Sequence, residues 1–201
     1  MEQKAIKHVY QRSKLFWLVG WILIIACRNE HPHALIITES DTIEIELYIE
    51  KAPVTVNNFM RYCHEGRFKN AIFYRAVRVD NQPDSKVQIE VLQGGLQDDF
   101  HPLMLAPIEH ESTLKTGIFH KDGVISMARN EPGTATSEFF ICIGDQPELD
   151  YGGDRNPDQQ GFAAFGKVVK GMDAIREYWQ MPTKGQYLDP PVKILDIILV
   201  D

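Results

Sequence analysis

Basic residues are scarce in this chain of 201 residues, which has 21 Lys and Arg against 28 Asp and Glu and a formal net charge of −7. Removal of residues 1–26, which hold four of the basic residues and one Glu, would leave 17 basic and 27 acidic residues. Nucleic acids and anionic lipid surfaces are bound through basic patches. We therefore expect no nucleic-acid partner and no electrostatic adhesion to a membrane.

Internal repeats, low-complexity tracts and internal linkers are also missing, so we expect one domain after the N-terminal segment. Metal-ligand spacing is missing too. Three histidines lie nine and ten residues apart, and we expect them to be solvated: His101, His110 and His120. A possible calcium loop begins at Asp154, but Gln159 stands where such a loop requires glycine. We expect no metal and no organic cofactor.

Long apolar runs are lacking except near the N-terminus, where Leu15 to Ala26 is an uncharged run of 12 residues. As a helix it would reach about 18 Å, short of the roughly 30 Å of hydrocarbon in a bilayer. Because a basic stretch precedes this run, residues 1–26 fit a signal peptide. An N-terminal anchor helix that is never cleaved remains the alternative.

The sequence Ile24-Ile25-Ala26-Cys27 resembles the bacterial lipobox, in which the cysteine is lipidated and becomes the new N-terminus. This resemblance implies lipidation of Cys27, a short tether over residues 27–34 and a domain over residues 35–201. Each buried methylene of an acyl chain contributes about 0.8 kcal/mol, so several chains would hold the domain on a bilayer. Arg28 follows the cysteine, where an aspartate would signal inner-membrane retention. We expect an exported protein that is lipid-anchored in the bacterial cell envelope, on the periplasmic side, with the outer membrane favoured.

Two further cysteines leave two possibilities open. Cys63 falls on the apolar face of an expected helix, and Cys142 falls in an expected strand. They are either isolated buried thiols or, in an exported protein, the two halves of a disulfide.

Short segments of alternating apolar and polar residues dominate the rest of the chain. We expect strands over residues 35–38, 42–48, 73–79, 87–92, 123–128, 138–143, 162–169 and 193–200. One helix should begin at Pro53, with Val56 and Phe59 on its apolar face, and another should cover residues 172–180. Many strands, two helices and few long crossovers predict a mainly β fold, a closed antiparallel β-barrel.

One strand residue does not fit its surroundings. Strict alternation places Arg75 on the same face as Phe73 and Val77, which puts five N–H donors and a permanent charge among hydrocarbon. A stem that lies along the sheet with its head in water would explain this without any function.

A series of segments resembles, in the same order, the cyclophilin-type peptidyl-prolyl cis-trans isomerases. The segments are EKAPVTVNNFMRYC (50–63), FYRAV (73–77), QGG (93–95), GVISMAR (123–129), SEFFICIG (137–144), ELD (148–150) and GFAAFGKVVKGMD (161–173). The resemblance runs from Leu35 to Asp201. It implies an eight-stranded antiparallel β-barrel capped by two α-helices, which agrees with the pattern of strands and helices.

The resemblance also implies that Arg75 is the catalytic residue. When the prolyl C–N bond is twisted, its nitrogen can accept a hydrogen bond, so a fixed donor would bind the twisted form better than the planar one. Phe140 would be the aromatic floor under the proline ring, and Gln93 would hydrogen-bond the substrate backbone. The complete substrate-binding set is Phe73, Val91, Gln93, Ala128, Arg129, Glu138, Phe140, Leu149 and Phe162.

Three departures from the family pattern affect the site. Glu138 stands where many members have glutamine, and it could pair with Arg75 or Arg129 or select against acidic substrates. Glu148 stands where cyclosporin-sensitive members carry tryptophan, so we expect weak cyclosporin binding. Residues 81–90 are an insertion that replaces the usual bulky wall of the pocket with a lengthened hairpin.

The first hypothesis is therefore a monomeric isomerase that accelerates X-Pro isomerisation in unfolded or exported polypeptides. The alternative is a chaperone or assembly module that binds proline-containing segments with little turnover. A structural lipoprotein with a decayed site is a third possibility.

Overall fold

The structure, a computed structural model, describes residues 31–97 and 100–200. The predicted signal peptide and the predicted lipidation site Cys27 lie outside the described residues, and they stay predictions. The first strand begins at His33, two residues before the start that the sequence predicted. Within the described ranges, every helix is too short or too polar to cross a bilayer.

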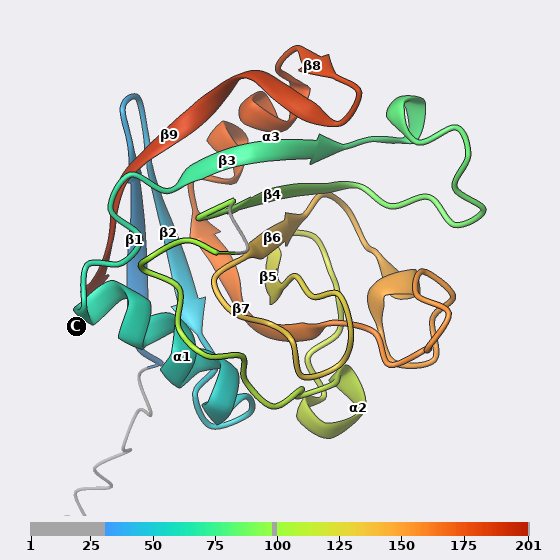
Figure 1. The fold of residues 1–201 in the computed structure, drawn as a ribbon, viewed down its shortest axis with the longest axis horizontal. Coiled ribbons are helices and arrows are strands. Elements are labelled where there is room, and N and C mark those ends of the chain that lie inside the picture. Colours follow the sequence, from blue (N-terminus) through green and yellow to red (C-terminus); the bar gives the residue numbers. More distant parts are fainter. Residues whose placement is uncertain (1–30, 98–99, 201) are drawn as a thin grey trace, which may run out of the picture.

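Eight antiparallel strands close into a barrel (Figure 1). They are β1 (His33–Thr38), β2 (Thr42–Leu47), β3 (Ile72–Val77), β4 (Val91–Gly95), β5 (Val124–Met127), β6 (Phe139–Cys142), β7 (Ala163–Lys170) and β9 (Tyr187–Val200). Neighbours follow the order β1-β2-β7-β5-β6-β4-β3-β9, and β9 pairs back with β1, so the ring has no open edge. The two-residue strand β8 (Thr183–Lys184) pairs with β9 outside this ring. The predicted closed barrel is confirmed.

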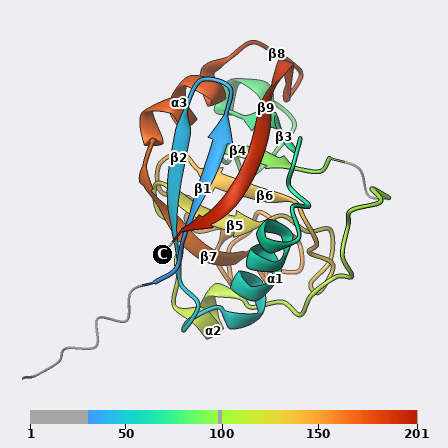
Figure 2. The same cartoon turned by 90° about the vertical axis from the view of Figure 1, so that its left-hand side faces the viewer.

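Two helices match the predicted ones, and they lie apart with barrel strands between them (Figure 2). The first is α1 (Pro53–His64), and the other is α3 (Met172–Gln180). The buried carboxylate of Glu111 accepts hydrogen bonds from the backbone nitrogens of Val54 and Thr55, which have no partner within the helix. A third helix, α2 (Thr113–Thr116), was not predicted because four residues are too few to show a helical period.

The apolar side chains form two clusters on opposite faces of the barrel wall. The interior cluster centres on Phe59 of α1, whose ring lies 5.2 Å from those of Phe68 and Phe165 and 5.9 Å from that of Phe139. The smaller cluster lies on the outer face of β3, β4 and β6 and includes Phe140. Alternation along β6 explains the division, since Phe139 faces inward and Phe140 outward.

The predicted strand over residues 87–92 is wrong over residues 87–90, because β4 begins only at Val91. The side chain of Gln82 takes the place of a neighbouring strand. Its Nε2 donates to the carbonyl oxygen of Ile89 (2.6 Å), and its Oε1 accepts from the nitrogen of Ile89 (3.3 Å). The backbone of residues 82–90 is therefore an irregular loop rather than half of a long hairpin.

The two cysteines in the described residues are free thiols, which settles the question that the sequence left open. Cys142 is fully buried and Cys63 is 9% exposed. Burial raises the pKa of Cys63, on α1, to about 12 and also raises the pKa of Cys142, on β6, because a buried thiolate loses its hydration.

A methyl group at Gly166 should destabilise the barrel. An added Cβ there would lie 2.3 Å from the carbonyl oxygen of Glu46, on the neighbouring strand β2. We expect Gly166→Ala to lower the free energy of unfolding by about 2–3 kcal/mol in urea titrations. Gly66→Ala is the matched control, because its Cβ would meet no atom within 4 Å and only its φ of +62° would resist alanine. The prediction fails if the two variants lose the same stability.

Both buried thiols should resist a thiol reagent such as Ellman's reagent at pH 8 in the folded protein, because the reactive thiolate is suppressed. A chain with Cys27→Ser restricts the readout to Cys63 and Cys142. Unfolding in urea should expose two reactive thiols. A raised folded pKa also means that the thiols stabilise the fold fully below about pH 9, the ordinary value, and that this contribution is lost as pH rises towards 12. Rapid reaction of either thiol before unfolding would contradict the structure.

Candidate active site

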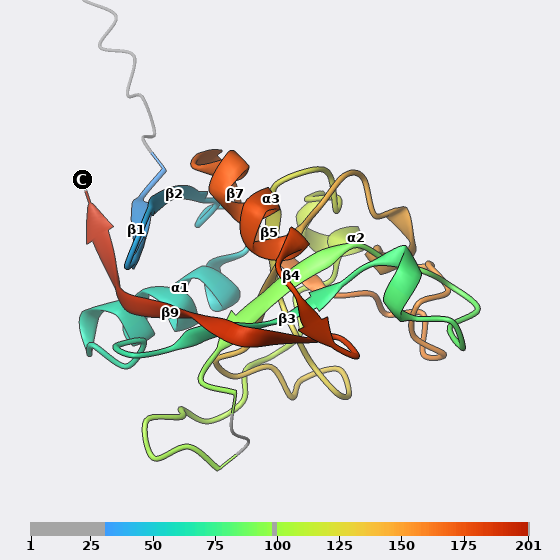
Figure 3. The same ribbon diagram turned by 90° about the horizontal axis from the view of Figure 1, so that it is seen from above.

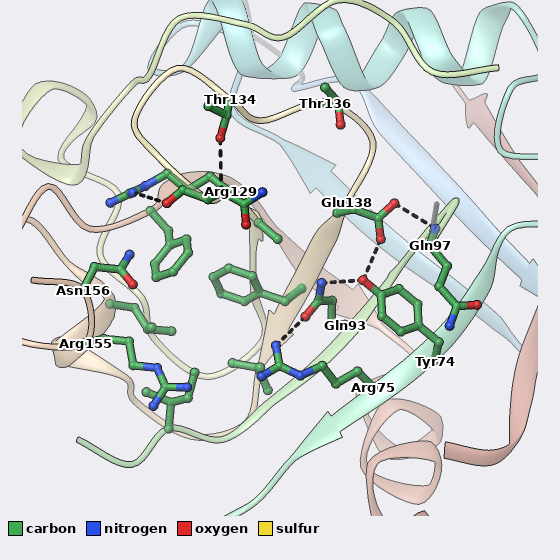
Figure 4. A pocket seen from close by; sticks show the side chains of 17 residues that line it. Tyr74, Arg75, Gln93, Gln97, Arg129, Thr134, Thr136, Glu138, Arg155 and Asn156 are labelled. Carbon is green, nitrogen blue, oxygen red and sulfur yellow. Dashed lines mark hydrogen bonds between the residues drawn. The ribbon is translucent and has the colours of Figure 1, made fainter. Parts of the chain in front are cut away.

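A cavity of about 320 Å³ opens on the outer face of the barrel, and we call it the outer pocket (Figure 4). Arg75 lines it, together with eight of the nine residues that the sequence assigned to substrate binding. These eight are Val91, Gln93, Ala128, Arg129, Glu138, Phe140, Leu149 and Phe162. The structure therefore brings together residues from β3, β4, β6 and the loops that precede β6 and β7.

A β-bulge in β3 aims Arg75 at this pocket. Phe73 pairs with Gly94 and Arg75 pairs with Gln93, so Tyr74 is an extra residue that interrupts the alternation. Phe73 consequently faces the barrel interior, fully buried against the ring of Phe139, and does not line the outer pocket. The sequence prediction that Phe73 binds substrate and shares a face with Arg75 is wrong, because it assumed an unbroken strand.

Two neutral amides hold the guanidinium of Arg75. Its Nη1 donates to Oε1 of Gln93 (2.8 Å), and its Nε and Nη2 donate to Oε1 of Gln186 (2.9 and 2.5 Å). Three of its five N–H donors are thereby used, which leaves one on Nη1 and one on Nη2. Burial lowers the pKa of Arg75, but a guanidinium stays protonated at any working pH.

The network continues from Gln93 to the carboxylate of Glu138. Gln93 Nε2 donates to the hydroxyl oxygen of Tyr74 (2.5 Å), and that hydroxyl donates to Oε2 of Glu138 (2.8 Å). The other carboxylate oxygen accepts from the backbone nitrogens of Leu96 (2.8 Å) and Gln97 (3.0 Å). Glu138 thus pairs with neither arginine that the sequence offered as its partner. Burial, and then the charge of Glu138, raise the pKa of Tyr74, which keeps this hydroxyl protonated as a donor.

Apolar side chains form the floor and walls of the outer pocket. Phe140 is 4% exposed, and its ring meets that of Phe162 edge to face at 5.3 Å. Leu149 and Ile89 are buried in the same cluster. Ile89 belongs to the loop over residues 82–90, so the insertion does supply a wall, but as an irregular segment and not as a strand.

A histidine supports this floor from behind. His120 is 1% exposed, which corrects the prediction of a solvated side chain, and its ring stacks on that of Phe140 at 5.9 Å. Its Nδ1 lies 2.7 Å from Oδ1 of Asp150, and its Nε2 lies 3.0 Å from Oγ of Ser126. Because both ring nitrogens have partners, His120 holds a fixed orientation beneath Phe140. In the described residues, no group of three or more His, Cys, Asp or Glu side chains is arranged to hold a metal ion.

Arg129 has a structural partner of its own. Its Nη1 and Nη2 donate to the two carboxylate oxygens of Asp158 at 2.7 and 2.9 Å. The guanidinium lies 5.2 Å from the centre of the Phe162 ring and is almost fully buried. Its charge is therefore compensated, and it positions Phe162 rather than facing the pocket as a free cation.

Several side chains that shape the site were not assigned to it from the sequence, among them Tyr74, Ile89, Arg155, Asn156 and Gln186. Tyr74 reaches the pocket only because of the bulge, which leaves no local signal in the sequence. Ile89 was expected in a strand, and its alternation with Val91 was the available clue. Arg155 and Gln186 come from loops far along the chain, and only the closed fold brings them near Arg75.

Comparisons with known proteins agree with this fold and site. Residues 33–198 match the family model for cyclophilin type peptidyl-prolyl cis-trans isomerases. The chain is 36% identical over 165 residues to peptidyl-prolyl cis-trans isomerase A of Dickeya dadantii, an alignment that covers 80% of this chain and 79% of that protein. It is 32% identical over 170 residues to peptidyl-prolyl cis-trans isomerase B of Escherichia coli, covering 81% and 93%.

Solved structures show the same fold. The crystal structure of a cyclophilin type peptidyl-prolyl cis-trans isomerase of Cryptosporidium parvum superposes with a TM-score of 0.66 at 21% identity, covering 85% of this chain and 98% of that one. The barrel, the family model and the bacterial relatives agree. The chain belongs to the family of cyclophilin-type peptidyl-prolyl cis-trans isomerases.

Proposed function

We propose that this cyclophilin-type isomerase acts on X-Pro bonds of exported or envelope proteins during their folding, with Arg75 as the catalytic residue. One observation carries the assignment of Arg75. Its partly buried guanidinium lines the same pocket as the apolar floor of Phe140, and two of its N–H donors have no hydrogen-bond partner among the described residues. Proline-containing polypeptides are the partners that such a pocket fits.

The chemistry requires only differential binding. A prolyl peptide bond is planar by resonance, with a rotation barrier of about 18–20 kcal/mol. In the twisted form the lone pair is localised on the nitrogen and can accept a hydrogen bond. A donor that binds this form better than the planar one lowers the barrier. The reaction needs no nucleophile and no proton transfer, because no σ bond is broken.

The surroundings of Arg75 suit this task. Gln93 and Gln186 orient the guanidinium without neutralising it, so its charge remains available to the twisted nitrogen. The rings of Phe140 and Phe162 provide a surface on which a proline ring can pack while the carbonyl side of the bond rotates. A hydrogen bond to a charged group contributes about 1.5–3 kcal/mol, or about one to two decades of rate.

Removal of the guanidinium should therefore slow isomerisation. We expect Arg75→Ala to lower kcat/KM for a proline tetrapeptide about 10- to 100-fold, and Arg75→Lys to fall between that variant and the parent. A protease-coupled or NMR exchange assay measures the rates. Arg61→Ala is the matched control, because Arg61 is exposed on α1 and pairs with Glu65 away from the pocket. Equal rates for the parent and Arg75→Ala, or no activity in the parent, would favour the alternative of a proline-binding module with little turnover.

We also propose that the mature protein is a lipoprotein of the bacterial envelope, because the lipobox-like sequence ends at Cys27. Mass spectrometry of protein purified from bacterial membranes should find a chain that begins at Cys27 and carries acyl chains. Cys27→Ser should appear without lipid and with its first 26 residues retained. An unlipidated chain of all 201 residues in the parent sample would refute the anchor and leave the isomerase assignment intact.

A further inference from the structure

Two arginines in the outer pocket have no acidic partner. Of the seven arginines in the described residues, five form ion pairs: Arg61, Arg67, Arg78, Arg129 and Arg176. The remaining two are Arg75 and Arg155, and both line the outer pocket. This is unexpected in a chain with 28 acidic and 21 basic residues, because carboxylates are plentiful.

Arg155 has a fixed position but unused donors. Its Nη1 donates to Oγ of Ser85 and to the carbonyl oxygen of Val87, both at 2.6 Å, which ties it to the loop over residues 82–90. This loop and the one that bears Arg155 project from the same side of the barrel (Figures 1 and 3). The Nε and Nη2 atoms of Arg155 make no hydrogen bond to the described residues. Burial and the nearby charge of Arg75 both lower the pKa of Arg155, and the attraction of an anion beside the two guanidinium groups would offset both effects.

A neighbouring amide also lacks a partner. Nδ2 of Asn156 is, among the residues that the structure describes, the one buried side-chain nitrogen or oxygen without a hydrogen-bond partner. Asn156 and Arg155 line the outer pocket on the side opposite Glu138 (Figure 4). A buried donor without an acceptor destabilises the protein, and a ligand oxygen would remove that cost.

The acidic groups nearby do not neutralise this end of the pocket. Glu148 accepts from the backbone nitrogen of Asp154 (2.9 Å), and Asp154 accepts from the side chain of Gln159 (2.9 Å). Asp158 is paired with Arg129. The carboxylate of Glu138 keeps its charge, because its donors are neutral, but it lies on the side of the pocket opposite Arg155 (Figure 4).

We infer that Arg155 and Asn156 form a specificity subsite for an acidic side chain directly adjacent to the substrate proline. The inference rests on the proposed isomerase function and names its substrate class. The adjoining walls of Ile89 and Leu149 are apolar, so the ligand that fits combines a proline ring with a neighbouring carboxylate. The sequence suggested that Glu138 could select against acidic substrates, whereas the subsite of Arg155 and Asn156 would select for them.

The test is a pair of proline tetrapeptide series with Ala, Gln, Glu or Lys immediately before or immediately after the proline. In one of the two series, the parent should prefer Glu over Gln about three- to tenfold in kcat/KM and should disfavour Lys. The preference should shrink as salt is added. A peptide whose Glu lies three residues from the proline controls for general attraction and should show no preference.

Five variants separate the charge of Arg155 from its loop contacts. Arg155→Gln should abolish the Glu-to-Gln ratio, Arg155→Lys should keep part of it, and Asn156→Ala should reduce it. Ser85→Ala removes a loop contact but keeps the guanidinium, so it should retain the ratio. Arg61→Gln makes the same charge change outside the pocket and should also retain it.

The outcomes distinguish this subsite from the isomerase assignment. Activity on the Ala peptides with a Glu-to-Gln ratio of one in both series would overturn the subsite and leave the enzyme standing. A ratio lost equally in Ser85→Ala and Arg155→Gln would overturn it as well, since loop position would then be the cause. If the parent isomerises no peptide, the proposed function fails. Calorimetric binding of the same peptides then decides the subsite, with tighter binding of the Glu peptide supporting it and equal binding overturning it.

Discussion

A permanent charge inside a hydrocarbon barrel carries a large desolvation cost, yet β3 has to fill that interior with Phe73 and Ala76 while presenting Arg75 elsewhere. The extra residue Tyr74 resolves this conflict, because the bulge lets consecutive parts of one strand face opposite sides of the wall. The position of the guanidinium, its amide partners and the pocket around it all follow from that local break in alternation.

The partners of Arg75 are amides, and this choice has an electrostatic reason. A carboxylate in contact would orient the guanidinium equally well but would cancel its charge and compete with any incoming acceptor. Glu138 is the carboxylate in this network, but Tyr74 and Gln93 lie between it and Arg75, so it does not contact the guanidinium. The acid is satisfied by backbone nitrogens instead. Asp158 is similarly occupied by Arg129, so the cationic end of the pocket stays uncompensated.

The sequence predicted the barrel because alternation and helical stripes are local properties, and most strand positions obeyed them. The resemblance to the cyclophilin family also placed Gln93, Phe140 and Leu149 in the pocket, where the structure finds them. It misplaced Phe73 because a bulge depends on pairing with a partner strand, which alternation in one segment does not reveal. It expected a strand over residues 87–90 for a similar reason, since the competing hydrogen bonds come from the side chain of Gln82.

The burial of His120 was equally inaccessible to sequence reasoning. Spacing between histidines says nothing about a ring that is enclosed by Asp150, Ser126 and Phe140 from three separate segments. Arg155 reaches the pocket across another such long-range contact. Features that arise from tertiary contacts, rather than from the period of one element, are the ones that required the structure.

The loop over residues 82–90 is held by side chains, among them Gln82, Gln146 and Arg155, and not by a ladder of backbone pairing. The sequence of this loop can therefore change without disturbing the register of any barrel strand, whereas the register of β3 against β4 depends on the bulge. Among relatives, the amino-acid sequence should accordingly vary more in the loop over residues 82–90 than in β3. One scaffold could then acquire new client preferences while its chemistry stays constant.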